Sequence, residues 1–245
     1  MDTSGLIDSL QAEGELLAST VTGDVWQAPV PPAPEWTLRD LVVHVGGVHR
    51  WAADVVATGS ATVETAAGAA VGVDPGVPDL AAWFADGHAA LVRVLRAAPP
   101  DLAAATFLPA ESPRHFWARR QAHETAIHRI DAEVATGRPV SGVTAEFAQD
   151  GIAEILLGFG RRRGNRVEQP VTLGLDATDG PSWLVTFGGD RTQAQQVDAL
   201  PHTDAAVAGP SAALYAWLWN RPAAVEVSSE DVARLWGGTV RVSWA

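Results

Sequence analysis

Apolar residues recur every three or four positions along four long stretches in the first part of the chain. This is the period of one face of an α-helix, so the pattern predicts four helices. We expect them at residues 4–21, 38–58, 80–97 and 113–136. Two start signals agree with these bounds: Thr37 stands as an N-cap, and Ser112 is an N-cap followed by a proline at the first helical position. Four long helices so close in sequence predict a helical bundle.

Two connections in this part are predicted to lack long elements. The segment Ala28–Pro34 contains four prolines, which exclude a helix and predict an ordered or polyproline-like connection. Residues 60–78 are small and weakly periodic, which predicts a loop.

The pattern changes in the last third of the chain. A fifth helix is expected at 144–160, and beyond it polar and apolar positions alternate as they do in strands. Strands are expected at 171–177, 182–187, 205–207, 224–227 and 239–242, and a helix at 211–219. The fold class is therefore α+β with two domains. An up-down four-helix bundle with its linking fifth helix is expected at 1–164, and a small α+β domain at 165–245.

Composition excludes several functions. The chain has 245 residues, of which 47% are apolar, and a formal net charge of −12. An acidic protein repels nucleic-acid phosphates, and no stripe of Lys and Arg offsets this, so nucleic acid is not an expected partner. No apolar run is long enough to span a membrane and the N-terminus lacks the pattern of a signal peptide, so we expect a cytoplasmic protein. The absence of cysteine excludes disulfides, cysteine zinc sites and a thiol nucleophile from the protein itself.

The fourth predicted helix carries a candidate metal site. Glu124 and His128 are four residues apart and share one helix face, so a single divalent ion such as zinc can bind both. His123 is five residues from His128, about 140° around the helix, and does not share that face. The alternative is a weak surface pair between Glu124 and His128, worth about 0.2–0.5 kcal/mol.

A third ligand is available on the second helix. His44 lies among apolar neighbours and is expected to be buried, where a histidine is more often a hydrogen-bonded core residue than a ligand. However, facing helices build metal sites inside bundles, and this bundle can present His44 opposite Glu124 and His128. Three protein ligands leave one position open, as in catalytic zinc sites.

Three stretches of the sequence carry a family resemblance: Trp36–His44 (WTLRDLVVH), Glu124–Asp131 (ETAIHRID) and Leu214–Arg221 (LYAWLWNR). They resemble the actinobacterial mycothiol-dependent maleylpyruvate isomerase family, within the wider DinB-like superfamily of bundles. The resemblance covers nearly the whole chain and implies a metal held by His44, Glu124 and His128, with mycothiol as the thiol cosubstrate. It also implies that Arg221 matches an arginine of the second domain that helps to form the isomerase active site, although Asn220 stands where the pattern has glycine.

The resemblance implies an enzyme that uses a low-molecular-weight thiol as the nucleophile on an electrophilic small molecule. Addition to a conjugated double bond, rotation and elimination would make it a cis–trans isomerase, and displacement would make it an S-transferase. The alternatives are a hydrolase with zinc-bound water, and a non-catalytic member that binds a ligand or a partner.

Three features of this site have more than one interpretation: the identity of the ion, the role of Asp131 and the role of Arg221. Zinc is the expected ion, but sites of histidine and glutamate also accept nickel, iron or manganese. Asp131, about one turn after His128, either orients that histidine or pairs with a nearby arginine such as Arg129. Arg221 either binds a substrate carboxylate or ends a helix.

Overall fold

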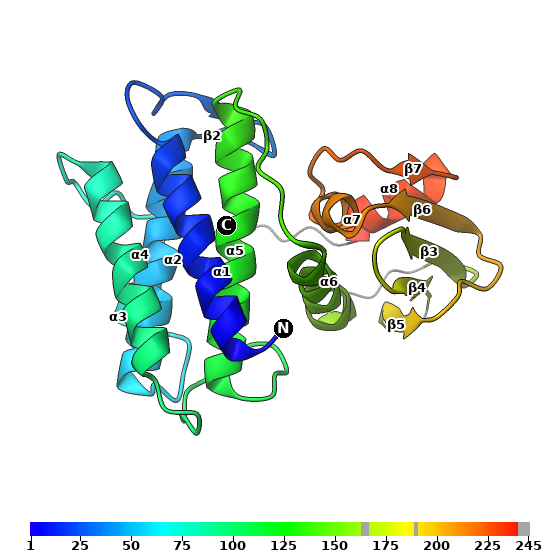
Figure 1. Ribbon diagram of the computed structural model, residues 1–245, viewed down its shortest axis with the longest axis horizontal. Coiled ribbons are helices and arrows are strands. Elements are labelled where there is room, and N and C mark those ends of the chain that lie inside the picture. Colours follow the sequence, from blue (N-terminus) through cyan, green and yellow to red (C-terminus); the bar gives the residue numbers. More distant parts are fainter. Residues whose placement is uncertain (163–166, 189–190, 240–245) are drawn as a thin grey trace. The chain divides into compact units, whose positions relative to one another are not determined.

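The computed structural model describes residues 1–162, 167–188 and 191–239 (Figure 1). The chain divides into two compact units, Met1–Ser141 and Gly142–Ala245. The first is mainly helical and the second combines helices with a sheet, which confirms the predicted α+β class with two domains. The division falls before the predicted boundary at residue 164, because α6 (Ala145–Glu154) packs against α7 (Ser211–Leu218) within the second unit. No helix in the described ranges has the length and apolar character needed to cross a bilayer.

The first unit is built from the four predicted helices. They are α1 (Thr3–Thr20), α2 (Leu38–Thr58), α4 (Leu80–Ala97) and α5 (Pro113–Ala135). Their start signals act as expected: Thr37 and Asp40 form a capping box on α2, and the Ser112 side chain accepts a hydrogen bond from the His115 backbone. Both α1 and α2 pack against α4 and α5, so α1 and α2 lie at opposite corners of the bundle.

The helix directions follow the order up, down, down, up, and do not alternate strictly (Figure 1). The helices α2 and α4 run parallel, since Gly46 lies against Trp83 and Gly87 lies against Arg50 one turn further along both helices. This direction is possible because the connection between them contains α3 (Ala66–Ala69) and is long enough to return along the length of α2.

The proline-rich connection forms a short antiparallel ladder between β1 (Pro29–Val30) and β2 (Ala33–Thr37). The predicted absence of a helix is confirmed there, but the ladder was not predicted. Its second strand runs directly into α2 and places the Trp36 ring 5.1 Å from the His44 ring.

A buried ionic network closes the first unit. The Arg129 side chain of α5 is fully buried and donates at 2.7 Å to Glu13 of α1 and at 2.7 Å to Glu133. It also donates to the Ser141 carbonyl at 2.7 Å, while the Ser141 hydroxyl donates to Glu133 at 2.7 Å. The network therefore fixes α1, α5 and the last residue of the unit to one another.

The second unit contains α6, a π-helical turn (Ile155–Phe159), a 3-10 turn (Gly160–Arg162), α7, α8 (Glu230–Thr239) and a five-stranded sheet. The strands are β3 (Val171–Ala177), β4 (Ser182–Phe187), β5 (Gln193–Val197), β6 (Ala205–Gly209) and β7 (Glu226–Val227). Their order in the sheet is β5-β4-β3-β6-β7, and the β3–β6 pair is parallel whereas the other pairs are antiparallel.

The predictions for this unit are met in part. The hairpin of β3 and β4, the β6 strand and α7 agree with the predicted positions, but β5 was not predicted. The strand predicted at 239–242 falls outside the described residues except at Thr239, where α8 ends.

Candidate metal centre

The helix α5 carries most of the candidate site and is buried along most of its length. Its buried polar side chains occupy several faces of the helix. In an ordinary surface helix, the polar side chains lie on the solvent-exposed side and apolar side chains face the core. The buried polar residues of α5 are Arg120, Gln121, His123, Glu124, Thr125, His128, Arg129, Asp131 and Glu133. Burial of so many polar groups is costly unless they pair with one another, so this helix is where paired or metal-bound groups are expected.

The structure brings the three predicted ligands together. The Oε1 atom of Glu124 lies 3.3 Å from His44 Nε2 and 3.2 Å from His128 Nε2. All three donor atoms lie within 4.8 Å of one another, and the three residues are 3–8% exposed. Within the described part of the chain, this is the one group of three such side chains with converging donor atoms.

These distances fit a metal site. Ligands on a tetrahedral ion with bonds of about 2.1 Å stand about 3.4 Å apart. Hydrogen bonds between charged groups are shorter, at about 2.7–2.9 Å. The separations around Glu124 Oε1 are closer to the first value, and all three donor atoms lie within 4.8 Å of one another, so these two imidazoles and one carboxylate oxygen could hold one divalent cation.

Two further side chains contact the candidate ligands. The Nδ1 atom of His128 lies 3.0 Å from Asp131 Oδ2, and Asp131 is only 1% exposed. Of the two interpretations of Asp131, the structure shows the contact with His128. On the other side, Arg120 Nη2 donates to Glu124 Oε2 at 2.9 Å. Arg120 was not predicted from the sequence, although its position four residues before Glu124 was a signal for an ion pair.

Hydrogen bonds and neighbouring charges shift the pKa values of two groups in the cluster, Glu124 and His128. Burial raises the pKa of the Glu124 carboxyl, but hydrogen bonds with His128 and His44 and the charge of Arg120 outweigh this and hold it well below its usual value. Burial lowers the pKa of His128, but hydrogen bonds to Asp131 and Glu124 outweigh this and raise the pKa to about 9. A pKa of about 9 keeps His128 protonated at neutral pH, so a cation that binds at Nε2 must displace that proton. Without that proton, Glu124, Asp131 and Arg120 carry one net negative charge, which offsets part of the charge of a bound cation.

The other histidines of the bundle lie away from this cluster. His123 is fully buried, and its donor atoms do not belong to the group of three. His88 has a packing role, since its ring stacks on Phe84 and its Nε2 donates to the Gln11 carbonyl at 3.2 Å.

His49, which the sequence analysis did not single out, is fully buried on α2. Its Nε2 lies 2.9 Å from the Thr125 hydroxyl, and that hydroxyl donates to the Gln121 carbonyl. Because the hydroxyl proton is used in this way, His49 Nε2 is the donor. Burial, followed by the neighbouring His88, lowers the pKa of His49 well below its usual value, which keeps it neutral. Its place among the apolar positions Val45 and Ala52 was the signal for burial.

Arg221 belongs to the second unit, just after α7. Asn220 before it adopts a left-handed conformation (φ 59°), a common way to end a helix. The Arg221 Nη1 atom donates to the Trp219 carbonyl at 2.6 Å. This contact agrees with the helix-ending interpretation, and a role of Arg221 toward a substrate stays a prediction.

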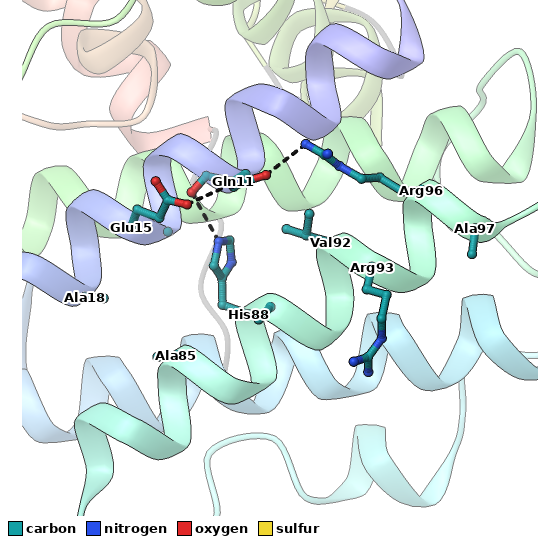
Figure 2. A pocket seen from close by; sticks show the side chains of 11 residues that line it. Gln11, Glu15, Ala18, Ala85, His88, Val92, Arg93, Arg96 and Ala97 are labelled. Carbon is teal, nitrogen blue, oxygen red and sulfur yellow. Dashed lines mark hydrogen bonds between the residues drawn. The ribbon is translucent and has the colours of Figure 1, made fainter.

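A cavity of about 690 Å³ lies elsewhere in the bundle, between α1 and α4 (Figure 2). Gln11 and Glu15 line it from α1, and His88, Val92 and Arg96 line it from α4. His44, Glu124 and His128 do not line this cavity, so it is separate from the candidate metal centre.

Comparison with known proteins agrees with this architecture. This chain is similar to two solved structures of a mycothiol-dependent maleylpyruvate isomerase. The TM-score is 0.60 for the native protein and 0.62 for a histidine-to-alanine mutant. Each is 14% identical in sequence, with 93% of both chains covered, so the likeness concerns the fold. A search of curated proteins found no match.

The sequence itself matches a family model described as the mycothiol maleylpyruvate isomerase N-terminal domain, over residues 8–133. The matched region contains α2 and nearly all of α5, which are the two helices that carry the candidate ligands. Since this region is just over half of the chain, the protein belongs to the mycothiol maleylpyruvate isomerase family.

Proposed function

We propose that this protein is a metal-dependent enzyme that uses a low-molecular-weight thiol, mycothiol, as the nucleophile on an electrophilic small molecule. The reaction would be a cis–trans isomerisation or an S-transfer. The observation that supports this most strongly is the buried convergence of His44 Nε2, His128 Nε2 and Glu124 Oε1. Family membership supports mycothiol as the thiol.

In this proposal, His44, Glu124 and His128 hold a divalent ion, with zinc favoured by the mixture of two imidazoles and one carboxylate. The bound ion would supply the positive charge that lowers the pKa of an incoming thiol. Asp131 accepts the proton on His128 Nδ1, which fixes the orientation of the ring and would leave Nε2 as the nitrogen that binds the ion once its proton is displaced. The Trp36 ring packs beside His44, with the two ring centroids 5.1 Å apart.

The thiol must come from outside the protein, since the chain has no cysteine. In the isomerase reaction, the thiolate forms a C–S bond to one carbon of a conjugated double bond and the electron pair moves into the conjugated system. Rotation about the resulting single bond and elimination of the thiolate restore the double bond with the other geometry. In an S-transferase, the C–S bond remains and a leaving group or an opened ring takes up the electron pair.

Arg221 is the proposed catalytic residue of the second unit. A guanidinium can bind a substrate carboxylate through two parallel hydrogen bonds, which would orient a carboxylate-bearing electrophile.

A hydrolase is the second candidate, because the same set of two histidines and one glutamate also occurs in zinc hydrolases that activate water. The two functions differ in their need for a thiol. A non-catalytic binding protein would show no turnover and would not require a bound ion.

The test combines metal analysis with a turnover assay. We expect about one divalent ion per purified chain, and consumption of an electrophile such as monochlorobimane or a cis-configured unsaturated diacid in the presence of mycothiol only. Turnover that proceeds equally well without any thiol would replace the proposal with the hydrolase. A protein that binds no ion, and whose thermal unfolding a chelator does not change, would exclude both enzymes.

A further inference from the structure

The two oxygens of Glu124 have different partners. Oε1 is shared by the two imidazoles at 3.2 and 3.3 Å, whereas Oε2 accepts a hydrogen bond from Arg120 Nη2 at 2.9 Å. Arg120 is 2% exposed and Glu124 is 3% exposed, so water does not compete for this contact. Both residues are one turn apart on the same helix, which holds the pair in a fixed geometry.

We propose that Arg120 is a positioning residue with two effects on the metal centre. It restricts Glu124 to a single-oxygen ligand, which leaves a coordination position open, and its positive charge weakens metal binding. This inference rests on the proposed function, because it assumes that His44, Glu124 and His128 bind a divalent ion.

The restriction follows from the chemistry of carboxylates. A carboxylate can bind a cation through one oxygen or through both. If Oε2 had no partner, Glu124 could offer both oxygens and would then occupy a second position around the ion. The hydrogen bond from Arg120 keeps Oε2 turned away from the imidazoles, so a position stays available to an incoming thiol.

The weaker binding follows from charge. The guanidinium is separated from the ligand cluster by one carboxylate group, and like charges a few ångströms apart repel strongly in a buried site. Arg120 therefore opposes metal binding, whereas Asp131 on the other side of the cluster favours it. The same positive charge keeps the ion electron-poor, which favours the thiolate form of an incoming thiol.

A substrate-binding role for Arg120 is not supported by its surroundings. Its side chain is almost completely buried, and the donor that faces the cluster is already engaged with Glu124.

The chain offers a matched control in Arg129. This arginine is also buried on α5 and also pairs with a glutamate four residues later, at 2.7 Å to Glu133. Glu133 does not belong to the ligand cluster. Arg129→Met therefore removes a buried arginine of the same helix whose partners, Glu13 and Glu133, lie outside the proposed metal centre.

The experiment uses Co²⁺ as the probe on the full chain. The dissociation constant is measured by competition with a chelator, and the coordination number is assessed from the visible absorption per bound ion, which is stronger for four-coordinate Co²⁺ than for higher coordination. We expect Arg120→Met to bind Co²⁺ at least about tenfold more tightly than the wild type, with weaker absorption per ion. Arg120→Lys restores the charge and a donor, so it should return both values toward the wild type. Arg129→Met should change neither.

A purely structural role for Arg120 would give the opposite result, because a disordered ligand set binds metal more weakly. Equal or weaker Co²⁺ binding by Arg120→Met, or an unchanged absorption per ion, overturns the inference. If Arg120→Met does not fold, Arg120→Gln keeps an N–H donor without the charge, and its binding must be tighter than that of the wild type. Failure of the proposed function looks different, since the wild-type protein itself would then bind no Co²⁺.

Discussion

Replacement of Asp131 by asparagine gives the most direct test of how the ligand set is supported. The carboxylate accepts the Nδ1 proton of His128 at 3.0 Å, and both side chains are buried. Asp131→Asn keeps the size of the side chain but removes its charge. The amide can still accept through its oxygen, so the position of the His128 ring should be retained, whereas its Nε2 becomes a weaker electron donor.

The size of the effect can be estimated from the contact. Loss of a partner behind a metal-bound histidine typically weakens metal binding by about 10–100-fold, or about 1.4–2.7 kcal/mol. The contacts of Glu124 Oε1 with the two imidazoles do not involve Asp131 directly, so binding should weaken without being abolished. His128→Ala removes the donor itself and should have a larger effect than Asp131→Asn.

The assay is competition between the protein and a chelator of known affinity, with the same zinc concentration for each variant. Asp8→Asn is the control, because Asp8 forms a surface pair with Arg96 at 2.8 Å. Loss of this exposed pair should change stability by less than about 1 kcal/mol and leave zinc binding unaltered. If Asp131→Asn binds zinc as tightly as the wild type, the reasoning about His128 is refuted.

Three further predictions concern the bundle as a whole. Removal of the metal with a chelator should lower the midpoint of thermal unfolding, because a ligand that binds only the folded state stabilises it; an unchanged midpoint would contradict the metal centre. Gly14→Ala should lower the free energy of unfolding by about 1–2 kcal/mol in urea, despite the better helix propensity of alanine, because the new Cβ would lie 2.2 Å from the buried His88 ring. Burial is the main cause that lowers the pKa of both His49 and His88, so the unfolded chain binds more protons than the folded protein near and below pH 6.5. The contribution of these two histidines to the free energy of unfolding should therefore be constant above that pH and fall below it, by up to about 1.4 kcal/mol per pH unit for each histidine. His128, whose pKa is raised to about 9, acts in the opposite sense as the pH rises above 6.5 in the metal-free protein. Urea titrations of His49→Gln should show a smaller slope below pH 6.5, with the exposed His202→Gln as the control.

The sequence was sufficient to predict the elements whose signals are local. Thr37 and Ser112 mark the helix starts correctly, and the shared face of Glu124 and His128 follows from helix geometry alone. His44 was the harder prediction, since it required the packing of two helices whose residues are 80 positions apart in sequence.

Other features depend on tertiary packing that the sequence does not reveal. β5 reads as a polar segment, Gln193–Val197, and it is a strand because β4 supplies its hydrogen bonds. The contact of Arg120 with Glu124 was one of several possible pairs on a helix rich in charges. Only the burial of α5 turns that pair into a constraint on the proposed metal centre.

The buried polar character of α5 has a consequence for biosynthesis. The ribosome releases α1, α2 and α4 first, and these helices expose the apolar surface that α5 later covers. The Arg129 network also includes Ser141, so it is complete only after residues beyond α5 have left the exit tunnel. Until α5 emerges, His44 also lacks Glu124 and His128, the two groups that converge with it in the folded bundle.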